Sequence, residues 1–523
     1  MVIFIGEARY TAVLLHAHIS VDLQSGMRSL NIVMFTSEAV PFAKTGGLAD
    51  VSGALPIELA ARGHRCLVIM PAYRHIYKSG IEIRPTDIGF AVQLSGRAVA
   101  ARLLKADIPN SSVEFYFVDQ PHYFDRQGIY NELSGDYRDN CERFSFFCAA
   151  AAQAVECLGV DVDVAHVHDW PTALIPAYVA THHGGHRWYH RAATVITIHN
   201  LAYQGRFHSS DFHWTGLDWK YFNYRQMEYY GDLNLMKTGL VFADRLTTVS
   251  HTYAKEIQTI ENGFGLDGVL RERAERLTGI VNGVDYHLWN PANDPHLPKP
   301  YDVHSWRAGK AECRRQLSEE LGLPFEPHVP LIGLVGRLAD QKGWDLVIPL
   351  MHQWIDHQAA QWVILGTGDA RYHESLNYLA SQAGNRIALR LEFSDRLAHR
   401  IEAAADMFLM PSRFEPCGLN QLYSLKYGTP PVVHAVGGLV DTVSHASQEN
   451  LQSKIATGFV FDRYSVDALE NCLRQACEVF RHQPDTWKQI VETGMQQDWS
   501  WLRSAREYEL VYSQAISDKQ HRA

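Results

Sequence analysis

The sequence has few cysteines and no long apolar run, and both absences restrict the class of protein. Eight of its 523 residues are cysteine, and none of them forms a CxxC pair. Because a chain of this length can bury a large core without disulfides, we expect free thiols, a reducing cytoplasm and no zinc site. No apolar stretch approaches the roughly 18 residues that a membrane span needs.

Positive charge is also in short supply. The 48 Lys and Arg residues are outnumbered by 58 Asp and Glu, which gives a net charge of -10, and no block of like charge stands out. This balance argues against duplex nucleic acid and anionic membranes as partners, but it leaves room for a local basic pocket. A composition of 46% hydrophobic and 20% charged residues is typical of a folded globular chain and excludes disorder.

Short apolar runs alternate with longer amphipathic stretches from residue 30 onward. In the first half, this pattern predicts strands at residues 31–36, 65–70, 113–118, 162–167, 193–199 and 245–250, and helices at 48–62 and 140–158. It restarts near residue 330, with strands at 331–336, 362–365, 387–391, 407–410 and 431–435, and helices at 344–358, 396–405 and 419–427. Strands that alternate with helices indicate an α/β fold with two doubly wound, mostly parallel, Rossmann-like lobes.

The composition also suggests where the lobes begin and end. We expect an N-terminal lobe, a Pro-rich polar linker, a C-terminal lobe and a helical tail that packs back on a lobe, at residues 27–289, 290–300, 301–484 and 485–523 respectively. Residues 1–26 lack a cluster of positive charge ahead of an apolar run, which argues against a secretory signal. They are expected to be a disordered extension, or to follow a start codon placed too early, with Met27 as the true start.

Two glycine turns, one in each half, carry the first chemical signal. Gly46-Gly47 and Gly437-Gly438 each follow a predicted strand and open a helix. Such a turn lets backbone N–H groups approach an anion, and the helix dipole favours negative charge there. Because ligands of open α/β sheets bind at the carboxyl ends of strands, the pair predicts an anionic ligand between the lobes. Simple turn chemistry is the alternative for either one.

Charged residues that could contact the same anion occur in both halves of the chain. Lys44 precedes the first glycine turn, while Arg337 and Lys342 follow a strand of the second half, an arrangement that suits a diphosphate. The alternatives are a solvated Lys44 and an ion pair of the other two with Asp340. Glu415 lies in a Pro-Cys-Gly turn, where it could contact a sugar hydroxyl or a developing positive charge, or act as a helix N-terminal acid.

Asp169 and His199 end two predicted strands, which places polar groups along one edge of the sheet. Neither a Walker A sequence, nor GxGxxG, nor HExxH is present, so P-loop, dinucleotide-binding and zinc-protease functions have no fingerprint here. Residues 161–163 resemble a metal-binding DxD, but alternate residues that enter a strand point the same way in any case.

Seven segments, taken together, resemble the bacterial glycogen synthases and plant starch synthases, retaining glycosyltransferases of family 5 with the GT-B fold. They are residues 44–51 (KTGGLADV), 168–170 (HDW), 197–205 (TIHNLAYQG), 281–285 (VNGVD), 336–338 (GRL), 415–421 (EPCGLNQ) and 437–443 (GGLVDTV). One such segment would be weak, but seven in family order over most of the chain are specific.

The resemblance implies a reaction without metal or cofactor. Glucose would pass from a nucleoside diphosphate, ADP-glucose first and UDP-glucose as the alternative, to the non-reducing 4-OH of an α-1,4-glucan such as glycogen, with retention. The leaving diphosphate would need charge stabilisation rather than a strong general acid. Closure of the two lobes over a central cleft would exclude water.

The resemblance also assigns roles to individual residues. The implied catalytic residues are Glu415, His199, Arg337 and Lys342. The implied donor-binding residues are Lys44, Gly46, Gly47, Asp50, Asp169, Asn282, Phe393, Cys417, Gly418, Leu419, Gly437 and Gly438. Two residues, Glu38 and Tyr130, match positions that face the acceptor glucan.

Two positions depart from the patterns of the family and its relatives. Phe393 stands where the family usually has a tyrosine that stacks on the nucleobase, so the base preference stays open. Tyr423 stands where related retaining transferases carry a second glutamate, which the bacterial glycogen synthases also lack. Three other functions are alternatives to a glucan synthase. They are another sugar-nucleotide transferase of the sucrose type, a glucan phosphorylase and an inactive glucan-binding protein. The phosphorylase is disfavoured because no pyridoxal-lysine signature is evident.

Overall fold

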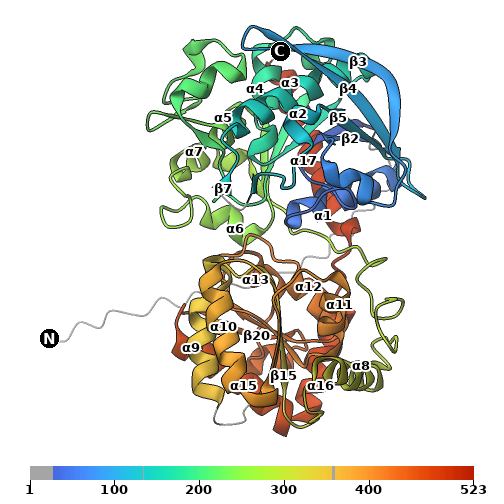
Figure 1. Cartoon of the computed structure of the whole chain (residues 1–523), viewed down its shortest axis with the longest axis vertical. Coiled ribbons are helices and arrows are strands. Elements are labelled where there is room, and N and C mark those ends of the chain that lie inside the picture. Colours follow the sequence, from blue (N-terminus) through green and yellow to red (C-terminus); the bar gives the residue numbers. More distant parts are fainter. Residues whose placement is uncertain (1–27, 133–134, 356–359, 523) are drawn as a thin grey trace, which may run out of the picture.

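The computed structural model describes residues 28–132, 135–355 and 360–522, which form two α/β lobes stacked along the long axis of the molecule (Figure 1). One lobe is built on a nine-stranded sheet and the other on a six-stranded sheet. The predicted fold class is therefore confirmed. The extension over residues 1–26 lies outside the described residues, as does the end of the helix predicted at 344–358.

The N-terminal sheet has a parallel centre and an antiparallel edge. Its strand order is β14-β13-β9-β8-β1-β2-β5-β4-β3. The parallel strands are β1 (Asn31–Phe35), β2 (Arg65–Pro71), β5 (Glu114–Asp119), β8 (Val164–His168), β9 (Ala193–Ile198), β13 (Arg245–Thr248) and β14 (Leu277–Gly279). The hairpin of β3 (Arg84–Leu94) and β4 (Arg97–Asp107), which the sequence analysis missed, extends the sheet beyond β5.

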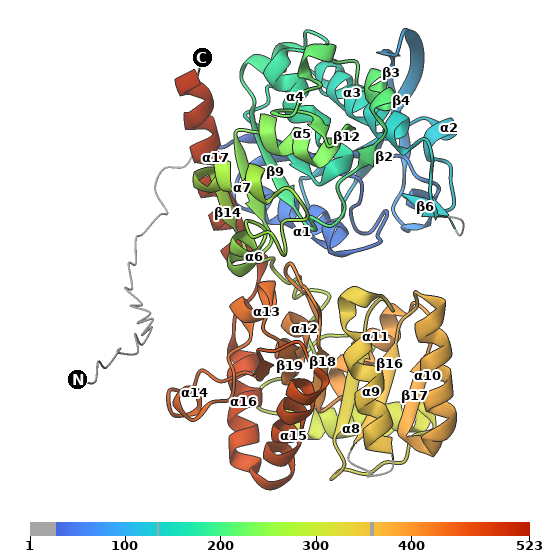
Figure 2. The same ribbon diagram turned by 90° about the vertical axis from the view of Figure 1, so that its left-hand side faces the viewer.

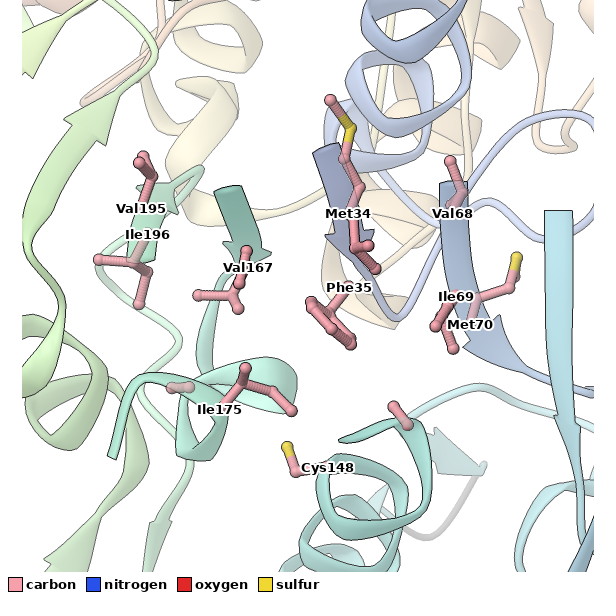
Figure 3. Packing of buried hydrophobic residues seen from close by; sticks show 14 of the residues in the cluster. Met34, Phe35, Val68, Ile69, Met70, Cys148, Val167, Ile175, Val195 and Ile196 are labelled. Carbon is pink, nitrogen blue, oxygen red and sulfur yellow. The ribbon is translucent and has the colours of Figure 1, made fainter. Parts of the chain in front are cut away.

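Helices cover both faces of this sheet. They include α1 (Gly47–Ala61), α3 (Asn140–Leu158), α4 (Leu174–Thr181), α5 (Leu235–Phe242), α6 (His251–Glu256) and α7 (Asp267–Glu272). Figure 3 shows the core at the centre of the sheet, where Phe35 of β1 lies between Val167 of β8 and Ile69 of β2, with Cys148 of α3 and Ile175 of α4 below the strands. Strands buried on both faces explain the continuous apolar runs of the sequence.

The C-terminal sheet is wholly parallel, with the order β17-β16-β15-β18-β19-β20. Its strands are β15 (Leu331–Val335), β16 (Gln361–Leu365), β17 (Ile387–Arg390), β18 (Met407–Met410), β19 (Pro431–His434) and β20 (Phe459–Phe461). The helices around it are α8 (Trp306–Leu321), α9 (Trp344–Trp354), α10 (Ala370–Gln382), α11 (Asp395–Ala404), α12 (Asn420–Tyr427), α13 (Gly437–Thr442), α14 (Gln448–Gln452), α15 (Val466–His482) and α16 (Pro484–Gln496).

The C-terminal segment, which we predict to be a helical tail packed on a lobe over residues 485–523, consists of two helices that pack on different lobes. Helix α16 packs on α12 and α15 of the C-terminal lobe, whereas α17 (Trp501–Arg522) crosses back and packs on α1 and β9 of the other lobe. Figure 2 shows α17 upright along one side of the N-terminal lobe. The tail is divided because its two helices bury their apolar faces in different cores, with Tyr508 and Tyr512 of α17 in the N-terminal one.

Two global features of the chain bear on its environment. All eight cysteines are free thiols, and all but Cys157 are buried. Within the described parts of the chain, no helix is both long enough and apolar enough to cross a membrane.

Candidate active site

The first glycine turn is held by a buried carboxylate. Glu38 accepts hydrogen bonds from the Thr45 N–H and hydroxyl groups, at 2.5 and 2.7 Å, and from the Gly46 N–H at 3.3 Å. The Tyr130 hydroxyl donates to the same carboxylate at 2.6 Å. Burial, reinforced by the charge of Glu38, raises the pKa of Tyr130 well above its ordinary value. In this structure Glu38 and Tyr130 therefore fix the turn, and their role toward the acceptor stays a prediction.

Lys44 and the start of α1 lie at the boundary between the lobes. The Lys44 ammonium lies 2.7 Å from Asp50 Oδ1, and its side chain is 40% exposed. A pocket of about 390 Å³ opens beside it, lined by Pro41, Phe42, Ala43, Lys44, Thr45, His75, Lys78, Gln127, Gly128 and Ile129. A Cβ added to Gly47 would lie 3.6 Å from Leu419 of the other lobe. At the start of α1 the Ala49 N–H donates to the Gly46 carbonyl oxygen at 3.2 Å. The N–H groups of Gly47 and Leu48 come before it, at the helix N-terminus, where an anion can bind.

Glu415 lies between β18 and α12, in contact with a cation. It is 5% exposed, and its Oε2 lies 2.6 Å from the Lys342 ammonium and accepts from the Ser412 hydroxyl at 2.9 Å. The Lys342 side chain is less buried than its partner, which leaves part of the ammonium open to a ligand. The pair therefore presents a carboxylate and a cation side by side.

Arg337 reaches from the C-terminal lobe toward the N-terminal one. Its guanidinium donates to Gln341 Oε1 at 3.1 Å and to the hydroxyl of Tyr203, in the other lobe, at 3.3 Å. The alternative pairing with Asp340 is not what the structure has, because Asp340 pairs with Arg371. Arg337 is thus directed at the boundary between the lobes.

The amides of the second glycine turn already have protein acceptors in this structure, and contact of Gly437 and Gly438 with the donor stays a prediction. The Gly437 N–H donates to Glu256 Oε1 of α6 at 2.9 Å, and the Gly438 N–H donates to the Glu415 carbonyl oxygen at 3.1 Å. Gly437 has φ of +46°, and a Cβ there would lie 2.0 Å from the same carbonyl oxygen. A Cβ on Gly438 would lie 2.2 Å from the Cys417 carbonyl oxygen. The glycines are needed for this close packing, which positions the Glu415 turn.

Asp169 and His199 meet at the ends of β8 and β9. The His199 N–H donates to Asp169 Oδ1 at 2.7 Å, and His199 Nε2 lies 3.0 Å from His168 Nδ1. Asp169 has φ of +56°, a strained conformation of the kind that collects at functional sites. Burial raises the pKa of Asp169 to about 8, and burial, helped by the neighbouring His168, lowers the pKa of His199 well below its ordinary value. His199 is therefore a neutral hydrogen-bonding group.

Among the remaining predicted residues, Asn282 and Gly418 lie in packed segments, whereas Phe393 lies on the surface. Asn282 is buried at the same boundary, and its backbone N–H faces the Cys417 thiol. Gly418 has φ of +72° in the turn after Cys417, which only glycine adopts without strain. Phe393, in contrast, is 82% exposed between β17 and α11, where its ring face is open.

Contacts that the sequence analysis missed join the lobes. The Ser250 hydroxyl donates to the Pro416 carbonyl oxygen at 2.6 Å, and the Thr252 N–H and hydroxyl donate to the Asp441 carboxylate at 2.9 and 2.6 Å. Tyr203 could have been found, because it lies inside a quoted motif. Glu256 carries no local signal, since its partner is far away in the sequence.

Two family models match the chain. Residues 31–272 match the starch synthase catalytic domain, and residues 322–484 match glycosyl transferases group 1. The glycogen synthase of Rhodopirellula baltica is 49% identical over 93% of this chain and 98% of its own length. The glycogen synthase of Syntrophotalea carbinolica is 44% identical over 93% of this chain and 99% of its own.

Solved structures agree with these matches. The catalytic domain of starch synthase IV from Arabidopsis thaliana, bound to ADP and acarbose, has a TM-score of 0.87 and 29% identity, covering 94% of this chain and 100% of its own. Sucrose-phosphate synthase from Thermosynechococcus elongatus, with a TM-score of 0.56, 16% identity and coverage of 93% and 99%, shares the fold. The chain therefore belongs to the glycogen and starch synthase family, and it is a glycosyltransferase of the GT-B fold.

Proposed function

We propose that the protein transfers glucose from ADP-glucose to the non-reducing 4-OH of an α-1,4-glucan such as glycogen, with retention of configuration. The observation that carries the proposal is the 2.6 Å contact between Lys342 and the buried Glu415. It pairs a cation for a diphosphate with a carboxylate for a sugar at the boundary between the lobes. Binding of ADP by the Arabidopsis starch synthase supports the choice of donor.

In this proposal, the diphosphate of the donor is neutralised from both lobes. Lys44 and the first turn of α1 act from one side, and Arg337 and Lys342 act from the other. Negative charge grows on the diphosphate as the glycosidic bond stretches, so fixed cations and N–H groups lower the barrier. Removal of one such group typically costs about 3–4 kcal/mol of transition-state stabilisation.

The glucose of the donor is held between Glu415 and the polar edge formed by Asp169 and His199. Since His199 is neutral, it acts by hydrogen bonding to a sugar hydroxyl rather than by charge. Glu415 is buried beside the Lys342 cation, and its carboxylate can stabilise positive charge that develops on the sugar ring. No protein nucleophile is needed for a same-face displacement by the acceptor.

The exposed ring of Phe393 stacks on the nucleobase of the donor. Stacking alone does not distinguish adenine from uracil, so we propose ADP-glucose as the main donor and UDP-glucose as a weaker alternative. The free thiols fit the cytoplasm, which is the location we propose.

A panel of donors and acceptors tests the function. The protein is incubated with ADP-glucose, UDP-glucose or GDP-glucose, together with glycogen, a short maltooligosaccharide or fructose 6-phosphate, and release of the nucleoside diphosphate is measured. We expect fast release only with ADP-glucose and a glucan. Release with fructose 6-phosphate would instead support a sucrose-type enzyme, and glucan binding without any release would support an inactive binding protein.

A further inference from the structure

Two histidines and an aspartate gather at the linker between the lobes, outside the site described above. His296 belongs to the linker, while Asp395 and His399 belong to α11. Their ligand atoms all lie within 4.8 Å of one another. In the parts of the chain that the structure describes, this is the one group of three or more His, Cys, Asp or Glu residues whose ligand atoms meet in this way.

The imidazole of His399 is fixed in orientation. Its side chain is buried, its ring stacks on Trp289 with the centroids 3.7 Å apart and the planes at 12°, and its Nδ1 lies 2.8 Å from Asp294 Oδ2. Because a carboxylate only accepts, Nδ1 carries the hydrogen. In the neutral ring, the Nε2 lone pair is then directed toward the other members of the group.

Asp294 organises both histidines. Its Oδ1 accepts from the backbone N–H of His296 at 2.8 Å, and its Oδ2 accepts from His399 and, at 2.6 Å, from the Tyr427 hydroxyl. A carboxylate that receives the far N–H of a histidine is the usual support of a metal-binding imidazole.

The third ligand, Asp395, lies close enough to His399 to share a metal ion with it and is open to solvent. Asp395 and His399 are four residues apart on α11, which places them on one helix face, and Asp395 Oδ2 lies 3.8 Å from His399 Nε2. Ligand atoms about 2.0–2.2 Å from a tetrahedral zinc ion are separated by roughly 3.3 Å, so a small side-chain rotation suffices. The Asp395 side chain is 64% exposed, which gives an ion a path of entry.

We propose that His296, Asp395 and His399 bind a divalent transition-metal ion of the zinc class, with Asp294 as the orienting carboxylate and water as the fourth ligand. The ion ties the linker between the lobes to α11. It is separate from the transfer reaction, because none of the three ligands contributes to the proposed donor and acceptor contacts. The competing arrangement is an ion-free one, in which a protonated His399 pairs with Asp294 and Asp395.

Cobalt serves as the probe, because four-coordinate Co²⁺ has visible absorption bands. The full chain, with any purification tag removed, is stripped of metal and titrated with Co²⁺. We expect one tetrahedral ion per chain, displaced by Zn²⁺. His296→Gln and Asp395→Asn change exposed or half-exposed side chains and should fold. They should weaken binding by more than about 100-fold, since loss of an orienting group alone costs 10–100-fold.

His190→Gln is the matched control, because His190 belongs to a separate histidine pair, stacked on His182 with the ring centroids 4.7 Å apart. It should leave the cobalt spectrum unchanged. A second readout is the melting temperature, which Zn²⁺ should raise in the unsubstituted protein but not in His296→Gln. The proposal is overturned if the unsubstituted chain gives no four-coordinate Co²⁺ spectrum, or if His296→Gln binds cobalt as tightly.

Discussion

The ammonium of Lys342 lies 2.6 Å from Oε2 of Glu415, although the two residues are on different segments of the C-terminal lobe. The lysine offsets the cost of burying the carboxylate, and the carboxylate fixes the lysine where the diphosphate of a donor is expected. Neither residue can therefore be changed without affecting the other.

Replacement of Glu415 tests the carboxylate directly. Glu415→Gln keeps the shape and can still accept from Ser412, but it removes the charge beside the reacting sugar. We expect turnover to fall by at least about 100-fold, because electrostatic groups of this kind contribute 10²–10³ in rate. Initial rates with ADP-glucose and glycogen measure this, with circular dichroism to verify the fold. Glu449→Gln, on α14, is the control, and wild-type turnover in Glu415→Gln would refute the assigned role.

Replacement of Lys44 tests binding of the donor separately from binding of the acceptor. Lys44→Gln removes a cation from the first glycine turn, so we expect the KM for ADP-glucose to rise about tenfold or more, as for loss of a charged hydrogen bond worth 1.5–3 kcal/mol. The KM for glycogen should change little. Lys220→Gln, an exposed lysine of the same lobe, is the matched control. An unchanged donor KM would argue against contact with the diphosphate.

Gly438 tests the role that the structure gives to the second glycine turn. A Cβ here would lie 2.2 Å from the Cys417 carbonyl oxygen, so Gly438→Ala must displace the turn that carries Glu415. We expect kcat to fall by about tenfold or more, because small misplacements of reacting groups are costly. Gly268→Ala, in α7, meets only a side-chain end at 4.0 Å and should leave kcat unchanged. Equal activity of both variants would contradict the positioning role.

The raised pKa of Asp169 makes the stability of the folded chain depend on pH. Burial raises its pKa to about 8 from 3.8, so between these values the folded chain keeps a proton that the unfolded chain has lost. The stability that the neutral carboxyl contributes is complete below the unfolded pKa and is lost as the pH rises through the folded one. Asp169→Asn cannot titrate, so its melting temperature should decline less than that of the unsubstituted protein between about pH 5 and pH 9. Parallel curves for both proteins would contradict this.

Glu509 anchors α17 to the N-terminal lobe. It accepts from two nitrogens of Arg62 at 2.7 Å each and lies 3.1 Å from His64 Nε2. Glu509→Gln removes the negative charge opposite Arg62 and His64. We expect a loss of about 2 kcal/mol in the free energy of unfolding, or roughly 4–8 °C in Tm. Glu507→Gln, two residues earlier in α17, should change the free energy of unfolding by less than about 0.5 kcal/mol. Scanning calorimetry compares the two, and equal Tm values would show that the anchor is unimportant.

The local sequence was enough to predict most of the regular elements. The strand at residues 407–410 and the helix at 140–158 have the predicted bounds, because buried parallel strands and amphipathic helices have strong apolar periods. The hairpin of β3 and β4 was missed, because its outer strand alternates half-buried and exposed residues and resembles a polar loop.

What the sequence could not provide is contact between distant segments. Nothing near Gly437 indicates that Glu256 accepts its N–H, or that the second glycine turn packs on Glu415. The strained backbone of Asp169 and the meeting of His296 with α11 likewise depend on tertiary structure. The motifs therefore indicated candidate site residues, and the fold adds the contact between the second glycine turn and the Glu415 segment, which no motif shows.

The most direct test of the proposed transfer is the linkage of its product. The protein is given ADP-glucose labelled with ¹³C at the anomeric carbon and a maltooligosaccharide, and the product is followed by NMR. The account predicts a chain longer by one glucose, with the label in an α-1,4 linkage at the non-reducing end. A β-linked label, or label found only as free glucose or on another acceptor, would contradict it.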